Sequence, residues 1–292
     1  MKKWRTHEAL NPKISVVIAV YNKPEVLKLC LEGYRRQSFF IKDGENFEII
    51  LADDGSTPEI EKLFAEFARS VPLPCTYLFQ ADSGWGKIRM LNWSIVEAHS
   101  DFLIFTDSDC VPHPHFVRAH YESQEEKTAL CGRRVDLMET VSEKLTLEDI
   151  RNGKLESPFW VLRNGWSRKI DYGDQGLYFP SWLVKISESF YHPPTVLGSN
   201  FSIHKKWLWE VNGFDESFKE PGLGEDTDIE RRFLLNGLKL KWITHRAIQF
   251  HVWHPLTCVG ERSRKTYELH KEKGNKEAVL GLQELKKFLN QK

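Results

Sequence analysis

The stretch that most constrains the fold is Phe102-Leu103-Ile104-Phe105-Thr106-Asp107-Ser108-Asp109. Its apolar half predicts a buried strand, and two aspartates follow almost at once. Carboxylates crowded at the end of a buried strand repel one another and lose hydration, which is costly unless a cation joins them. Oxygen ligands suit Mg²⁺ or Mn²⁺, and these ions commonly carry phosphates. Asp107 and Asp109 are therefore candidate ligands of a metal that binds a nucleotide diphosphate.

Composition narrows the class of protein. The chain has 292 residues, 41% of them hydrophobic, and a formal net charge of zero, which fits one large domain and not a basic nucleic-acid binder. The first twelve residues are polar, and no apolar run approaches the roughly 20 residues of a membrane span. The five cysteines form no C-x-x-C pair, so neither a zinc site nor a disulfide framework is indicated. We expect a cytoplasmic enzyme.

The first half of the chain alternates strands and helices. The expected strands are residues 14–20, 47–52, 76–80 and 101–106, and the expected helices are residues 24–37, 58–69 and 87–98. Pro24 and Pro58 suit the first turn of a helix, and Thr57 is a candidate N-cap. This alternation predicts a parallel sheet with right-handed crossovers, and ligands of such sheets bind beyond the carboxyl ends of the strands.

The second half is less regular. Residues 138–195 are rich in aromatic residues, glycine, proline and serine, and we expect an inserted loop region that either covers the site or packs against the sheet. Further strands are expected at residues 196–203, 239–243 and 247–250, and helices at residues 205–211 and 225–236. From residue 261 the chain is charged and helical. Its apolar side is expected to pack on the body, with a peripheral membrane contact left open. That side consists of Leu280, Leu282, Leu285, Phe288 and Leu289.

Several segments together resemble a known family. The segments are Ile14–Asn22, Ala52–Ser56, Thr106–Asp109, Gly198–Phe201, Gly213–Glu216 and Gly224–Asp226. They look like the family 2 glycosyltransferases, and the second half also resembles the C-terminal module of β-1,4-galactosyltransferases. The resemblance covers about residues 14–137 and 196–255. It implies the GT-A fold, an α/β architecture with a mixed, mainly parallel sheet flanked by helices.

The resemblance extends the metal site to His251-Val252-Trp253-His254. The resembling galactosyltransferases place a methionine and a histidine at this spacing as metal ligands. Here His251 stands at the methionine position, so its role is open, and His254 is the stronger candidate. Neutral imidazole suits Mn²⁺ better than Mg²⁺.

A nucleotide pocket is expected around Tyr21, Asp53 and Arg89. Tyr21 offers a face for a pyrimidine, and Asp53 can accept the imide N–H of uracil, which favours a uridine or thymidine donor. Arg89 would contact the base or the diphosphate, and Lys87 is either a further contact or a solvated charge. Asp54 is the alternative to Asp53 and is expected to cap the following turn. The matched motifs also place Ala19 and Ser108 at this pocket.

The Gly224-Glu225-Asp226 segment is the candidate for catalysis. A carboxylate here can deprotonate an acceptor hydroxyl as it attacks the anomeric carbon. In the resembling transferases the aspartate of this pair is the base, which corresponds to Asp226, and Glu225 would bind the acceptor. Direct attack implies inversion. Helix capping by acidic residues explains the same composition.

The sequence thus predicts a metal-dependent, inverting glycosyltransferase. It would move a sugar from a nucleotide diphosphate, with a UDP-sugar favoured, to a glycan or glycolipid, as in bacterial polysaccharide synthesis. The expected domains are a catalytic domain at residues 1–260 and a helical extension at residues 261–292. Within the catalytic domain, residues 14–137 bind the nucleotide, residues 138–195 are an insertion and residues 196–260 bind the acceptor. A sugar nucleotidyltransferase and a non-catalytic carbohydrate-binding protein remain as alternatives.

Overall fold

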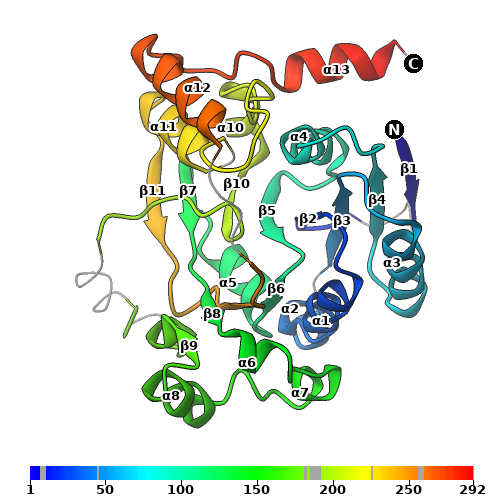
Figure 1. Cartoon of the computed structure of the whole chain (residues 1–292), viewed down its shortest axis with the longest axis vertical. Helices are drawn as coiled ribbons and strands as arrows, with labels where there is room; N and C mark the ends of the chain where they lie inside the picture. The colour runs from blue at the N-terminus through cyan, green and yellow to red at the C-terminus, as the bar shows by residue number, and fades with distance from the viewer. Residues whose placement is uncertain are drawn as a thin grey trace.

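The computed structural model describes residues 1–6, 11–44, 46–180, 183–184, 192–224, 226–255 and 260–291. Within these ranges the chain folds around one large sheet and a smaller one (Figure 1). No helix in the described ranges combines the length and the apolar character that crossing a membrane requires.

The large sheet has eight strands in the order β1-β4-β3-β2-β5-β10-β7-β11. Strands β4, β3, β2 and β5 are mutually parallel, β10 is antiparallel to both of its neighbours, and β11 is parallel to β7. The predicted mixed, mainly parallel sheet is therefore confirmed. The strands are β1 (Lys2–Arg5), β2 (Ile14–Val20), β3 (Phe47–Asp53), β4 (Cys75–Phe79), β5 (Phe102–Asp107), β7 (Thr128–Cys131), β10 (Phe201–His204) and β11 (Lys239–Trp242).

The central strands of this sheet are buried on both sides because helices cover both faces. In β2, Val16 and Ile18 face one apolar layer, and Val17 and Ala19 face the other. The first layer contains α1 (Pro24–Arg35), α2 (Ser38–Ile41), α3 (Pro58–Ser70) and α5 (Phe116–Glu122). The second contains α4 (Lys87–Glu97), α10 (Lys205–Glu210) and α11 (Thr227–Leu235). The expected helices are confirmed, with Thr57 at the N-cap of α3 and proline in the first turn of α1 and α3.

A four-stranded sheet, β6-β12-β8-β9, lies beside the carboxyl ends of the large sheet's strands. Its strands are β6 (Cys110–Pro112), β8 (Val135–Leu137), β9 (Ile170–Asp171) and β12 (Gln249–His251). They share an apolar core with α7 and α8. The segment from residue 138 is therefore not the irregular loop that we expected. It forms α6 (Glu139–Ser142), α7 (Leu147–Arg151), α8 (Pro158–Trp166) and the 3₁₀ turn η1 (Gly173–Gly176), while most of residues 181–191 lie outside the described ranges.

The C-terminal helices are α12 (Glu261–Glu272) and α13 (Leu282–Asn290). Leu282 and Leu285 of α13 are buried in the same core as α4, and Phe288 and Leu289 are partly buried against it. The expectation that this apolar side packs on the body is confirmed for these four residues, whereas Leu280, before the helix, is 44% exposed. Figure 1 shows α13 running beside α4 at one end of the molecule.

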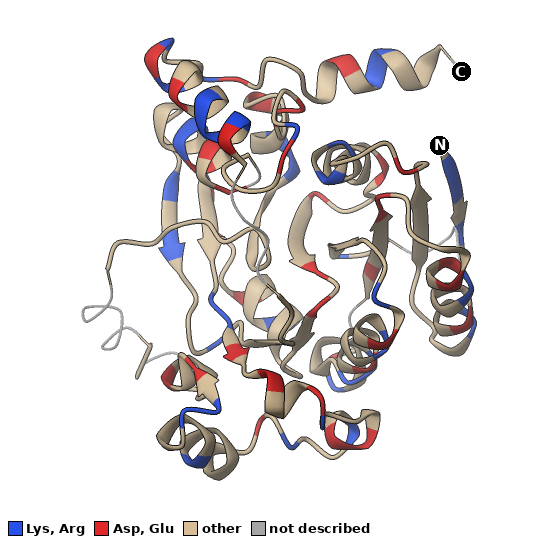
Figure 2. Ribbon diagram, viewed as in Figure 1, with Lys and Arg blue, Asp and Glu red and all other residues tan. Residues whose placement is uncertain are grey.

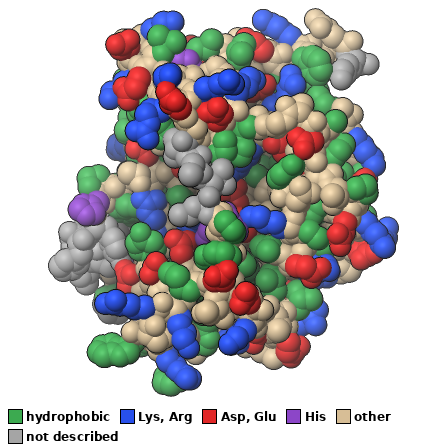
Figure 3. Space-filling model, in the orientation of Figure 1, with side chains coloured by type: hydrophobic (Ala, Val, Ile, Leu, Met, Phe, Trp, Pro, Cys, Tyr) green, Lys and Arg blue, Asp and Glu red, His purple; other side chains and the backbone are tan. Residues whose placement is uncertain are grey.

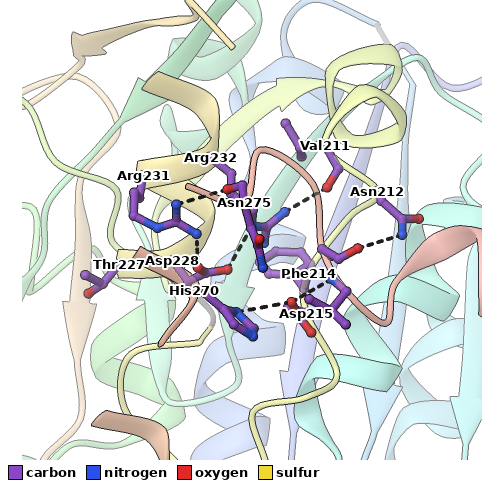
Figure 4. A network of polar contacts seen from close by, with 12 residues as sticks. Val211, Asn212, Phe214, Asp215, Thr227, Asp228, Arg231, Arg232, His270 and Asn275 are labelled. Carbon is purple, nitrogen blue, oxygen red and sulfur yellow. Dashed lines mark hydrogen bonds and ion pairs between the residues drawn. The ribbon is translucent and has the colours of Figure 1, made fainter. Parts of the chain in front are cut away.

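A buried polar network attaches the C-terminal segment to α11 (Figure 4). Arg232 and Asp228, one helical turn apart and both fully buried, form an ion pair of 2.8 Å between Nε and Oδ2. Arg232 also donates to the carbonyls of Val211 and Gly213, and Arg231 donates to the carbonyl of Asn275. A neighbouring contact of 3.5 Å joins His270 of α12 to Asp215. The start of α11 is thereby fixed from both sides.

We predict that Arg232→Met lowers the free energy of unfolding by about 3–5 kcal/mol, because it leaves the buried Asp228 and two carbonyls with fewer partners. Urea denaturation followed by tryptophan fluorescence measures this loss. Lys265→Met is the matched control, because its ion pair with Glu261 is 75% and 80% exposed and should contribute little. Equal effects of the two variants would contradict the role given to Arg232.

Candidate active site

The carboxyl ends of β2, β3 and β5 bring the first group of candidate residues together. Pairing between these strands aligns Ala19 with Asp107 and Val20 with Asp53. The backbone N–H of Ser108 donates to the carbonyl of Ala19 at 2.9 Å, and the Ser108 residue is only 8% exposed. Parallel strands that end at one edge therefore place Ala19, Asp107 and Ser108 side by side, as the sequence predicted.

The turn after β2 is held in an uncommon conformation. Asn22 and Lys23 have φ angles of 57° and 56°, in the left-handed region that residues other than glycine seldom adopt. Asn22 is fixed by its N–H to Ser56 Oγ at 2.7 Å and by its Oδ1, which accepts from the Thr57 N–H at 3.1 Å. Tyr21 projects from this turn, is 52% exposed and donates to Asp82 Oδ2 at 3.0 Å. Its ring is accessible for stacking.

Asp53, and not Asp54, caps the turn that follows β3. Asp53 is fully buried and caps the turn, because its Oδ1 accepts from the Ser56 N–H and its Oδ2 from the Tyr77 hydroxyl at 2.7 Å. Burial raises the pKa of Asp53 against these hydrogen bonds. Asp54 is 7% exposed and accepts from Gln80 and from the Gly86 N–H. The expectation that Asp54 caps the turn is wrong, and both carboxylates already have protein partners.

Lys87 and Arg89 lie on different sides of α4. Two residues along a helix differ by about 200° in direction, so the two side chains cannot both face one site. Lys87 forms an ion pair of 2.8 Å with Asp107 at the candidate site. Arg89 instead lies 3.4 Å from a Glu216 carboxylate oxygen and over the ring of Phe288 in α13. The contact of Arg89 with the nucleotide stays a prediction.

Asp109 stands between two imidazoles. Its Oδ2 is 3.1 Å from His254 Nε2, and its Oδ1 is 3.7 Å from His251 Nε2. The two Nε2 atoms are 3.3 Å apart. Burial alone would raise the pKa of Asp109, but the hydrogen bond with His254 and the charges of His251, His254 and Lys23 hold that pKa well below its usual range. The hydrogen bond with Asp109 raises the pKa of His254, against the effect of burial.

Second partners orient both rings so that Nε2 faces Asp109. His251 Nδ1 is 3.1 Å from Asp136 Oδ1, and His254 Nδ1 is 2.9 Å from the carbonyl of Pro255. A carbonyl only accepts, so His254 donates through Nδ1–H, and Nε2 becomes a ligand atom when it loses the proton that it donates to Asp109. Asp136 has the same effect on His251, and it is in turn 2.9 Å from Arg134 Nε. The sequence reasoning missed Asp136 and Arg134, because nothing in their local pattern distinguishes them from surface charges.

These three residues fit a divalent metal ion. Asp109, His251 and His254 each offer a ligand atom, and the atoms lie within 4.8 Å of one another. One carboxylate and two imidazoles with fixed tautomers suit Mn²⁺ better than Mg²⁺. Asp107 lies at the neighbouring strand end with Lys87, outside this cluster. A second acidic group, Asp215, Asp228 and His270, is fully buried, and arginine already provides its counter-charge.

Asp226 occupies the N-cap of α11, at the position where the sequence placed a helix start. Its Oδ1 accepts from the Thr227 N–H at 2.6 Å and from the Thr227 hydroxyl. Within the described ranges no hydrogen bond involves Asp226 Oδ2, so a second oxygen remains for an acceptor hydroxyl. Glu225 lies outside the described residues.

Two successive arginines, Arg133 and Arg134, experience the charges of the acidic groups. The charges of Glu230 and Asp226 act on Arg133, although burial is the largest effect and lowers its pKa. The carboxylates of Asp136, Asp107 and Asp109 act on Arg134, and they raise its pKa against the effect of burial. Both arginines follow β7, and Arg134 is the one that contacts the candidate metal site, through Asp136.

Comparisons with known proteins agree with this architecture. The family model for glycosyl transferase family 2 matches residues 15–210, and a related model, glycosyl transferase family group 2, matches residues 176–267. The chain belongs to glycosyl transferase family 2.

Relatives include the chondroitin synthase of Escherichia coli, 26% identical over 253 residues, which are 82% of this chain and 34% of that protein. The hyaluronan synthase of Pasteurella multocida is 23% identical over 79% of this chain and 24% of that protein. The uncharacterized glycosyltransferase YfnE of Bacillus subtilis is 26% identical over 84% of this chain and 66% of its own length. This chain therefore spans about a quarter to a third of the two synthases.

Solved structures share the fold. GalNAc-T7 with UDP, GalNAc and Mn²⁺ has a TM-score of 0.61 and 16% identity, over 91% of this chain and 48% of that one. The mannosyltransferase PcManGT of Pyrobaculum calidifontis with GDP-Man and Mn²⁺ has a TM-score of 0.54 and 14% identity, over 90% and 61%. These similarities show the GT-A fold.

We predict that Mn²⁺ affinity falls about tenfold per pH unit below the raised pKa of His254, because the proton and the metal compete for Nε2. Titration of Mn²⁺ by electron paramagnetic resonance between pH 5.5 and 8.5 measures this dependence. His254→Ala should weaken binding at every pH, and His192→Ala, which changes an exposed histidine, should not. Binding that does not vary with pH would contradict the assignment of His254.

Proposed function

We propose that this chain is a metal-dependent, inverting glycosyltransferase that uses a UDP-sugar and a glycan or glycolipid acceptor. The observation that carries the proposal is the cluster of Asp109, which follows β5, with His251 and His254 at the end of β12. In a family 2 chain, this cluster would hold a metal ion that favours the departure of a nucleoside diphosphate. In support, one of the solved structures with the same fold contains UDP and Mn²⁺.

The donor would bind along the ends of β2, β3 and β5. Tyr21 would stack on the uracil ring. Asp53 would accept the uracil imide, with Asp54 as the alternative; both carboxylates are buried and would have to exchange a protein partner for the base. We assign the contact with the diphosphate to Lys87, not to Arg89, because Lys87 already forms an ion pair at this edge. Ala19 and Ser108 would frame the pocket through their backbones.

The metal, when bound, would offset the charge that develops on the departing diphosphate. Asp109, His251 and His254 would hold it, and Asp107 would contribute through water or after releasing Lys87. Asp226 would accept the proton of the acceptor hydroxyl through Oδ2 while Thr227 holds Oδ1. Direct attack by that hydroxyl on the anomeric carbon inverts the configuration. Glu225 would bind the acceptor beside it.

The same proposal includes the expected domains: a catalytic domain of residues 1–260, whose second half is similar to the β-1,4-galactosyltransferase module, and an extension of residues 261–292. The printed names of two relatives, chondroitin synthase and hyaluronan synthase, support a role in bacterial polysaccharide synthesis. The described cysteines are free and buried, which supports a cytoplasmic location.

Product analysis tests the proposed activity. The protein, Mn²⁺ and a panel of UDP-sugars are incubated with glycan acceptors, and UDP and pyrophosphate are quantified. We expect UDP release that stops in excess EDTA and in Asp109→Asn. Pyrophosphate release would indicate nucleotidyl transfer. If none of the donors binds in calorimetry, a carbohydrate-binding role is favoured. Full activity in excess EDTA would contradict the proposed metal dependence.

Asp226→Asn tests the base. Because asparagine keeps the shape and the N-cap but loses basicity, we expect kcat to fall roughly 10²–10⁴-fold while UDP affinity is unchanged. Asp171→Asn, at an exposed position, is the matched control. Near wild-type kcat in Asp226→Asn would mean that Asp226 only caps α11.

A further inference from the structure

Helix α8 presents to solvent an apolar face that no described residue covers. Phe159, Leu162 and Trp166 are 74%, 61% and 93% exposed. Their spacing of three and four residues places them on one side of the helix. Val161, on the other side, is buried in the core of the small sheet, so α8 is anchored by one face while the other is free.

The three exposed apolar side chains of this face are adjacent, unlike single apolar residues that are scattered over a protein surface. Large apolar side chains that are mostly exposed and adjacent on one helix mark an interaction surface. The apolar side of α13 makes the contrast within the same chain, since Leu282 and Leu285 are 0% and 3% exposed. The face of α8 therefore has the composition of a contact surface, and no described residue covers it.

Basic residues border the apolar face. Arg163, Arg168 and Lys169 are exposed, and no acidic residue occurs between Glu156 and Asp171. Among the described residues, no ion pair or side-chain hydrogen bond involves these three cations. Figure 2 shows the basic residues on α8 and on the segment that follows it. Figure 3 shows hydrophobic and basic side chains gathered at this end of the molecule.

The surface is connected to the candidate active site. The strand after α8, β9, pairs with β8 so that Asp171 lies opposite Asp136. Strand β8 pairs with β12 so that Asp136 lies opposite His251. Two steps of strand pairing thus join the end of α8 to a candidate metal ligand.

We propose that α8 docks on the surface of an anionic lipid bilayer. Phe159, Leu162 and Trp166 enter the interface between headgroups and acyl chains, and Arg163, Arg168 and Lys169 contact lipid phosphates. Tryptophan, phenylalanine and leucine on one face with lysine and arginine beside them are the composition of interfacial helices. Docking would present the site to a lipid-linked acceptor. Presentation to such an acceptor rests on the proposed function.

A second copy of the chain fits the surface less well. A symmetric contact through α8 would set three unpaired cations against the same three cations of the partner, which is repulsive. An anionic lipid surface instead complements both parts of the face, because its interface accepts the apolar side chains and its phosphates attract the cations.

Vesicle flotation tests the proposal without donor, acceptor or an activity measurement, so its failure is separate from failure of the proposed function. We expect the protein to float with phosphatidylcholine vesicles that contain 30% phosphatidylglycerol, and weakly with phosphatidylcholine alone. Each basic residue near such a surface contributes about fivefold to partitioning, so R163Q/R168Q/K169Q should weaken it on the order of 100-fold. Phe159→Ala with Trp166→Ala should weaken it at least about tenfold.

Ile41→Ala is the matched control, because Ile41 has the same 61% exposure as Leu162 but lies on α2. It should float like the wild-type protein. Wild-type protein that stays unbound to anionic vesicles overturns the proposal, as does binding that both sets of substitutions leave unchanged. Sedimentation of the wild-type protein as a dimer that F159A/W166A converts to a monomer would assign the face to a second copy.

Discussion

The parallel pairing of β2 with β3 on one side and β5 on the other is the constraint on which the site depends. Because β2 is buried on both faces, its register with its neighbours is fixed by two apolar layers. That register places the turn of Tyr21, the buried Asp53 and the half-buried Asp107 along one edge. The left-handed turn at Asn22 and Lys23 is tolerated because Ser56 and Thr57, from the neighbouring strand's loop, bond to it.

The site also requires that the negative charge of Asp109 is balanced. A carboxylate in so enclosed a position needs partners of opposite charge or strong donors, and the two histidines come from β12 and the residues after it, far away in sequence. Asp109 precedes β6, which pairs with β12, so the small sheet brings the two segments together. Asp136 on the next strand orients His251. The small sheet is therefore what assembles the candidate metal ligands.

Two amphipathic helices, α13 and α8, differ in whether their apolar face is packed or exposed. The apolar side of α13 closes over α4, and Arg231, which donates to the carbonyl of Asn275, ties the same C-terminal segment to α11. The exposed face of α8 has no such partner among the described residues. Both helices have apolar residues at helical spacing, so their sequences alone do not distinguish a packed helix from a docking helix.

The sequence by itself determined the strands of the first half and the aspartates that end them. Continuous β-branched runs, first-turn prolines and glycines are local signals that the tertiary structure did not override. Only the tertiary structure decided which charges meet. Arg89 turns to Glu216 because helix geometry separates it from Lys87, and Asp53 is enclosed by Tyr77 from a neighbouring strand. Asp136 acquires its role through strand pairing with His251. Contacts of this kind depend on residues distant in sequence, and no local pattern encodes them.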